Sequence, residues 1–224
     1  MNPIGRKEAI RMAMKAALDL KLDPKNTRPH DLYLFAQLTS SKDSYTLKLD
    51  NDSQKKVISI AEGLQDRDSF MAVAYSLGIL RVPIYGGTEY PAAGRLVYFA
   101  DPNVFSTAAT VTLSESEQVN HVYWGRHTLQ TNEGIRINEA RNLQFMTVQE
   151  TQGSASTLNM LTGMELKEIG AVIRFAGGDN NQIITTFDCE DKSLIGGPAT
   201  HNNYLFWRLC GAIIKGATNK SYLG

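Results

Sequence analysis

Cysteine is scarce in this chain, which has two, Cys189 and Cys210, among its 224 residues. Small secreted domains held by disulfides use many more, and structural zinc sites need closely spaced cysteine pairs. Cys210 lies in a largely apolar run, residues 205–214, where a buried thiol behaves as a small hydrophobic side chain. We therefore expect two structural thiols, with a disulfide between Cys189 and Cys210 as the alternative.

An excess of either charge is also missing, because 23 Lys and Arg residues balance 23 Asp and Glu residues. A general nucleic-acid binder needs a basic face, so this class is disfavoured. No apolar run approaches the roughly 20 residues of a transmembrane helix. Arg11 and Lys15 interrupt the segment that would form the apolar core of a signal peptide. We expect a soluble chain made in the cytoplasm.

The common motifs of catalysis and cofactor binding are absent as well. The chain has no G-x-S-x-G nucleophile turn, no G-x-x-x-x-G-K-[ST] phosphate loop and no G-x-G-x-x-G dinucleotide motif. Gly153 and Ser154 lie in a small-residue run, 152–157, that is typical of a loop. The Gly-rich stretch at 177–181 precedes no helical pattern, and we interpret it as a hairpin turn between strands at 165–175 and 182–187. These observations predict a protein that is not an enzyme and has no cofactor and no small-molecule substrate.

The titratable residues form no convincing catalytic or metal-binding constellation. Histidine occurs four times, as His30, His121, His127 and His201. His121 and His127 are six residues apart and would need a bend at Gly125 to face one ligand, so we expect strand or turn histidines. Glu115 and Glu117 could share a strand face as an acidic pair, but their position favours a solvated turn or sheet edge. We assign no catalytic, cofactor-binding or metal-binding residue.

One segment, residues 5–22, has the pattern of an amphipathic helix. Its apolar residues recur at three- and four-residue steps, namely Ile10, Met14, Ala17 and Leu18. Pro24 then ends it. The first 25 residues contain six basic and three acidic side chains. The helix is expected to lie against the body or a neighbouring subunit, and the alternative is a basic arm that contacts nucleic acid or a membrane surface.

Beyond Pro29 the apolar pattern changes to a period of two, as in strands. Short runs rich in β-branched and aromatic residues are separated by Gly, Pro, Asn and Asp, at 32–38, 44–49, 56–60, 79–85, 95–100, 108–113, 119–124, 143–149, 165–175, 182–187 and 204–214. Residues 68–78 fit both a helix and a strand, and the flanking pattern favours a strand. Many short strands without long alternating helices predict an all-β antiparallel sandwich or barrel.

Two pairs of adjacent aromatic residues, Tyr123-Trp124 and Phe206-Trp207, could form a platform on which a sugar stacks. Because successive side chains of a strand point to opposite faces, one member of each pair is expected in the core. A binding module would expose Trp124 or Trp207. Core packing is the simpler interpretation of both pairs.

The organisation of the chain resembles that of the jelly-roll capsid proteins of tailless bacterial viruses. The resemblance rests on a helical arm at 6–22 that leads through Pro24 and Pro29 into a strand at 32–38, on the segment 99–105, and on the closing strand at 204–209. It implies a jelly-roll sandwich with an N-terminal helical arm at 1–30 and a β body at 31–224. A single jelly roll is favoured over a compact double one.

The resemblance also implies a function and a set of partners. The protein would be a structural virion (capsid) protein of a bacteriophage that self-assembles as a homo-oligomer into a symmetric shell. It would contact other virion proteins, and its arm would contact nucleic acid or an internal membrane. The alternative is a non-catalytic β-sandwich module that binds a carbohydrate or a receptor.

Overall fold

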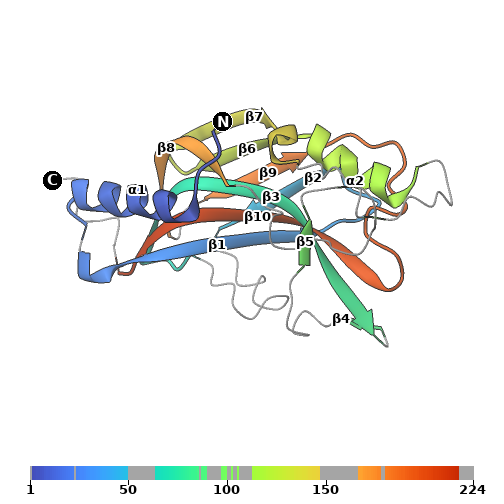
Figure 1. Ribbon diagram of the computed structural model, residues 1–224, viewed down its shortest axis with the longest axis horizontal. Coiled ribbons are helices and arrows are strands. Elements are labelled where there is room, and N and C mark those ends of the chain that lie inside the picture. Colours follow the sequence, from blue (N-terminus) through green and yellow to red (C-terminus); the bar gives the residue numbers. More distant parts are fainter. Residues whose placement is uncertain are drawn as a thin grey trace.

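The computed structural model describes residues 2–22, 24–49, 64–85, 87–89, 97–99, 102, 105, 113–146, 166–177 and 180–216. Within these residues the chain forms two antiparallel β-sheets packed face to face, with an N-terminal helix against the first sheet (Figure 1). The predicted all-β antiparallel sandwich with an N-terminal helix is therefore confirmed. The strand predicted at 56–60, residues 108–112 of the strand predicted at 108–113, and the loop at 152–157 lie outside the described residues.

The first sheet is built around one long strand, β3. Its main strands, in spatial order, are β1 (Thr27–Gln37), β10 (His201–Ile214), β3 (Ser69–Tyr85) and β8 (Lys167–Ala176). One edge of β3 pairs with β10, and the other edge is shared by β8 and the short strands β5 (Val97–Phe99) and β4 (Thr88–Glu89). The strand preferred for 68–78 is thus confirmed as the first part of β3.

The second sheet has the spatial order β2 (Ser44–Lys48), β9 (Gln182–Thr186), β6 (Arg126–Thr131) and β7 (Gly134–Arg141). Since β8 belongs to the first sheet and β9 to the second, the hairpin predicted at 177–181 is wrong. The chain instead crosses between the sheets there. A Cβ atom on Gly177 would lie 1.7 Å from the backbone oxygen of Gln65, so this crossing needs a glycine.

The eight main strands pair in a nested order. β1 pairs with β10, β2 with β9, β3 with β8 and β6 with β7, and all four pairs are antiparallel. The first strand therefore pairs with the last, the second with the last but one, and so on inward. Two further pairings, β10 with β3 and β9 with β6, join these four ribbons into the two sheets.

The main core lies between the sheets and is centred on Trp207. The Trp207 ring stacks on Tyr75 with 5.6 Å between ring centroids, and its Nε1 donates to Thr185 Oγ1 of the second sheet at 2.9 Å. Phe206 packs in a separate cluster with Leu80 and is also buried. Both members of this aromatic pair are therefore enclosed, on opposite faces of β10, and neither offers a stacking platform.

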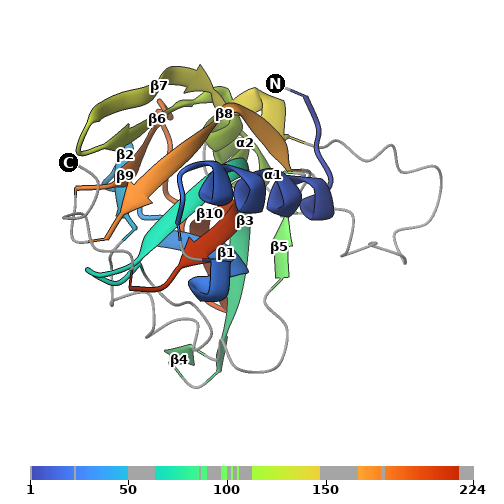
Figure 2. The same ribbon diagram turned by 90° about the vertical axis from the view of Figure 1, so that its left-hand side faces the viewer.

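The helix α1 (Arg6–Asp19) packs on the outer face of the first sheet, where it crosses in front of β10 and β3 in Figure 2. Its buried residues are the small side chains Ala9, Ala13 and Ala17, which share a cluster with Met71, Cys210 and Ala212. The predicted apolar face was wrong at Leu18, whose side chain is 54% exposed. The alanines lie at four-residue steps, and side chains this small let the helix approach the sheet closely.

A Schellman motif ends α1 ahead of the short 3-10 helix η1 (Pro24–Asn26). Leu22 N donates to Ala17 O at 3.0 Å, and Lys21 N donates to Leu18 O at 2.8 Å. Lys21 has a φ of 56°, the left-handed conformation that this motif requires and that glycine adopts most easily. Strand β1 then starts at Thr27, within the segment that the sequence assigned to the arm.

Replacing Lys21 by glycine is expected to stabilise the protein by about 0.5–1 kcal/mol, because glycine meets no steric penalty at this φ. Urea unfolding would measure the change. Lys21→Ala is the matched control, since it removes the same charged side chain but keeps Cβ. If Lys21→Ala raises the free energy of unfolding as much as Lys21→Gly, the gain does not come from the lower cost of the left-handed conformation.

The helix α2 (Glu115–Trp124) replaces two predicted features, the strand at 119–124 and the solvated turn at Glu115 and Glu117. Ser114 and Glu117 form a capping box, in which Glu117 N donates to Ser114 Oγ and Ser114 N donates to the Glu117 carboxylate at 2.8 Å. This reciprocal cap starts the helix. The strand predicted at 143–149 is also wrong at its start, where the 3-10 helix η4 (Asn142–Phe145) forms.

Candidate functional site

The histidines do not converge on a metal site. His121, on α2, donates from Nδ1 to Asp188 O at 2.7 Å, whereas His127, on β6, is buried. Among the residues that the structure describes, no group of three or more His, Cys, Asp or Glu side chains could hold a metal ion. In the same part of the chain, no helix combines the length and the apolar character needed to cross a membrane.

His127 belongs to a buried polar chain inside the core. Its Nδ1 lies 2.9 Å from Asn142 Oδ1, and its Nε2 lies 3.0 Å from the Tyr75 hydroxyl. Asn142 Nδ2 donates to Val122 O, so Asn142 Oδ1 is the acceptor and His127 Nδ1 must carry the proton. Nε2 then accepts from Tyr75. This neutral imidazole links α2, η4 and the two sheets, and it is closed to a ligand.

Burial lowers the pKa of His127 to about 4, from 6.5 for an exposed histidine. As the pH falls below 6.5, the unfolded chain takes up the proton first. The stability contributed by the neutral ring is therefore fully present above pH 6.5 and is lost as the pH falls toward 4. We expect a loss on the order of 3 kcal/mol, measured by urea unfolding at pH 7, 5.5 and 4.5. In His127→Gln this dependence should be shallower, and equal slopes in both proteins would contradict the assignment.

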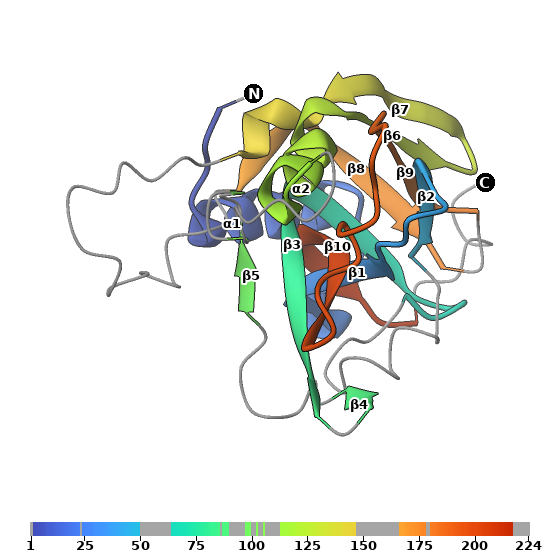
Figure 3. The ribbon, with the colours of Figure 1, turned by 90° about the vertical axis from the view of Figure 1, so that its right-hand side faces the viewer.

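Glu115 lies in a second buried cluster, at the start of α2, the helix that Figure 3 shows nearest the viewer. Arg81 donates from one nitrogen to both carboxylate oxygens, at 2.8 and 3.0 Å, and Asn203 Nδ2 donates at 2.9 Å. The guanidinium group also lies 5.0 Å from the centre of the Phe105 ring. With three donated hydrogen bonds and a side chain 3% exposed, this carboxylate is placed to anchor α2 rather than to accept a proton from a substrate.

The two cysteines are free and buried, so the alternative of a disulfide between them is wrong. Cys210 packs with α1, while Cys189 lies in the main core and donates to Asp191 O at 2.9 Å. Burial raises the pKa of Cys210 to about 12. The thiol is therefore protonated at neutral pH and is a poor nucleophile.

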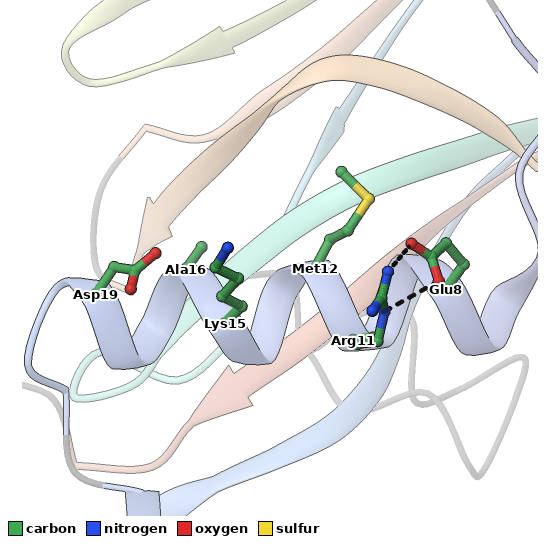
Figure 4. Close-up of a pocket in the computed structure, with 6 residues that line it drawn as sticks. All are labelled: Glu8, Arg11, Met12, Lys15, Ala16 and Asp19. Atoms are coloured by element: carbon green, nitrogen blue, oxygen red, sulfur yellow. Dashed lines mark hydrogen bonds and ion pairs between the residues drawn. The ribbon is translucent and has the colours of Figure 1, made fainter.

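A groove of about 450 Å³ runs along the outside of α1, where Glu8, Arg11, Met12, Lys15, Ala16 and Asp19 line it (Figure 4). Arg11 donates to both carboxylate oxygens of Glu8, at 3.0 and 2.6 Å. That pairing lowers the pKa of Glu8. The four charged side chains balance, so these residues give the groove no preference for a ligand of either sign.

The most distinctive exposed feature is a surface formed by Trp124, Arg126, Glu139, Arg141 and Leu143, here called the Trp124 surface. Trp124 ends α2 and is 69% exposed, and Leu143 starts η4 and is 46% exposed. Asn142 N donates to Gly125 O at 3.0 Å, which brings the end of α2 beside η4. The centroid of the His121 ring lies 6.3 Å from that of Trp124.

The Trp124 surface also holds an unusual arrangement of charges. Arg126 and Arg141 are exposed and lie opposite each other on β6 and β7. Like charges in such a pair repel. Glu139 accepts a hydrogen bond from Arg126 at 3.0 Å, and its φ of 46° is left-handed although it is not glycine. Arg141 has no ion pair within the described residues.

Sequence reasoning found part of this surface and missed the rest. It identified Trp124 as one of two tryptophans that a binding module would expose, and the structure exposes Trp124 while burying Trp207 completely. It missed the charged residues because the strands β6 and β7 were not predicted. The alternation of His127, Leu129 and Thr131 before a turn at 132–134 was the available signal.

Comparison with known proteins gives no match: no family model, no curated protein and no solved structure resembles the chain closely enough. The function must therefore be argued from features of the molecule itself. Two of them carry that argument, namely the nested pairing of the strands and the Trp124 surface.

Proposed function

We propose that this protein is a structural virion protein, a single jelly roll that self-assembles into a symmetric shell. The observation that carries the proposal is the nested pairing of β1 with β10, β2 with β9, β3 with β8 and β6 with β7. A ribbon of paired strands rolled into two sheets gives this order, and eight strands in two Greek keys define a jelly roll. Viral capsid domains are among the proteins that use it.

The surface of the molecule is compatible with contacts between copies. The first sheet has an unpaired edge along β1 in the described structure. Leu18 and Leu20 at the end of α1 are 54% and 48% exposed. The formal net charge of zero limits long-range repulsion between identical chains. We assign the end of α1 to the contact between copies.

Light scattering over a concentration series tests the proposal, and electron microscopy would follow. We expect a closed oligomer or growth into particles. A variant with Leu18→Ser and Leu20→Ser should assemble less, whereas Ile135→Ser, which removes an apolar side chain 58% exposed on β7, should assemble normally. The intact chain is the sample to use, because removing α1 would uncover Met71, Cys210 and Ala212. A monomer of 24.8 kDa at every concentration would contradict self-assembly.

A second candidate function, a non-catalytic carbohydrate-binding or receptor-binding module, is favoured by the exposure of Trp124. Tryptophan is enriched at binding surfaces, where an aromatic face packs against a partner. Jelly rolls also occur in lectin domains. Shell formation and glycan binding are compatible in one chain, since they use different surfaces.

Trp124→Ala is expected to abolish glycan binding and to leave the free energy of unfolding within about 0.5 kcal/mol, because the side chain is mostly in water. A glycan array read with the native protein and the variant measures the first effect, and urea unfolding measures the second. Ile135→Ala is the matched control, as it shortens another exposed apolar side chain of the second sheet. Equal binding by all three proteins would exclude Trp124 as the contact.

A further inference from the structure

We infer that the Trp124 surface recognises an acidic sugar, a pyranose that carries a carboxylate, as part of a glycan. The inference rests on the second candidate function and names its ligand class. The sugar ring would lie on Trp124, its carboxylate would meet Arg141, and its hydroxyls would meet the Arg126–Glu139 pair.

The charge for an anion comes from the two arginines. Arg126 and Arg141 are direct partners across β6 and β7, and facing side chains in such a pair have Cβ atoms about 5 Å apart. Glu139 pairs with Arg126, at 3.0 Å between Nη1 and Oε2, and so neutralises only one of the two arginines. One guanidinium, that of Arg141, is left without an acidic partner within the described residues and faces solvent. A ligand carboxylate can pair with this planar fork through two hydrogen bonds.

The apolar part of the ligand has a defined place beside these charges. Next to the Arg126–Arg141 pair, Asn142 N donates to Gly125 O and joins the same two chain segments. Trp124 and Leu143 are the next residues on these segments, one on each. Their side chains are 69% and 46% exposed. A sugar ring has one face of C–H groups and a rim of hydroxyls, which matches an indole with charged groups along one side.

Glu139 distinguishes a sugar from other acidic ligands. Its left-handed φ of 46° occurs where the register of β6 and β7 shifts, and its carboxylate is 64% exposed while paired with Arg126. Strained residues of this kind concentrate at functional sites. A carboxylate accepts hydrogen bonds from hydroxyls but repels the regularly spaced phosphates of a nucleic acid. The excess of a single positive charge in the cluster fits one carboxylate better than a chain of phosphates.

The two tryptophans give the experiment its signal. Trp207 is completely buried and Trp124 is exposed, so a ligand that covers the surface changes the emission and the acrylamide quenching of Trp124 alone. The probes are trigalacturonic acid and 3′-sialyllactose, each compared with its methyl ester, which keeps the ring and removes the charge. Lactose and an oligothymidylate complete the set.

We expect each acid to bind at least tenfold more tightly than its ester. Arg141→Gln should remove this difference and leave the binding of the ester unchanged. Arg136→Gln is the matched control, because it removes one charge from the same strand and should preserve the difference. Trp124→Ala, followed by calorimetry, should lose both the acid and the ester.

The outcomes separate the inference from the function on which it rests. Equal binding of acid and ester, or binding of lactose alone, would show that the surface does not recognise a carboxylate. The second candidate function, glycan binding on Trp124, would still stand. Binding of the oligothymidylate alone would mean that the Trp124 surface recognises a nucleic acid and not a sugar. If no probe alters the emission of Trp124, the inference and the binding function are both wrong.

Discussion

A Gly211→Ala variant should lose about 3 kcal/mol or more of unfolding free energy. The methyl group would lie 1.8 Å from Met71 O and 3.2 Å from the Cα of Ala72, both backbone atoms of β3. At this point the register of β10 against β3 shifts, since Cys210 faces Ala74 whereas Gly211 faces Ala72. The bulge brings the two backbones so close that no rotamer change can make room.

Urea unfolding at neutral pH measures this loss, with near-ultraviolet circular dichroism as a check on the aromatic core. Gly5→Ala is the matched control, because no atom lies within 4 Å of the position of its new Cβ. It should change the unfolding free energy by less than about 1 kcal/mol. A Gly211→Ala protein as stable as the control would mean that the strands separate there at little cost.

Glu115→Ala is expected to cost about 3–5 kcal/mol, because it leaves a largely buried arginine without its counter-charge. The Arg81 side chain is 19% exposed, and it would lose the only carboxylate that the described structure places against it. Asn203 Nδ2 would lose the same acceptor, at 2.9 Å. The start of α2 would lose its anchor on the first sheet.

Two further variants test the origin of that cost. Glu115→Gln keeps the shape and one acceptor oxygen, so its loss should be smaller than that of the alanine variant. The double variant Arg81→Leu with Glu115→Leu removes both charges and should be more stable than Glu115→Ala. A double variant that is less stable than Glu115→Ala would show that the ion pair contributes net stability. The cost of Glu115→Ala would then not come merely from the unpaired charge.

The strands that sequence could predict are those whose apolar pattern matches their burial. Residues 204–214 and 182–187 show this, because β10 is buried on both faces and β9 alternates. The segment 119–124 was wrongly predicted as a strand, since its apolar and aromatic residues suit a strand as well as a helix. The capping box of Ser114 and Glu117, a local signal, decides for the helix.

The candidate site was less accessible to sequence reasoning than the fold. An exposed indole and a buried one look the same in a sequence, and the distinction between Trp124 and Trp207 depends on which surfaces the sheets cover. The pairing of Arg126 with Arg141 depends on a hairpin whose outward residues are mostly polar. Long-range packing determines both the exposure of each tryptophan and the pairing of the two arginines, and a local sequence pattern does not indicate long-range packing.

The nested pairing has a consequence for how the protein is made. The first sheet joins Thr27 to Ile214 and Gln37 to Tyr204, so β1 leaves the ribosome long before its partner is synthesised. Contacts between residues so distant in the chain form slowly, since the cost of closing the loop precedes the gain from pairing. The hairpin of β6 and β7 is the pair closest in sequence among the four and is expected to form first. Until β10 is synthesised, it cannot cover the apolar face of β1. We expect a chaperone to bind the nascent chain during this time, because exposed apolar surface promotes aggregation.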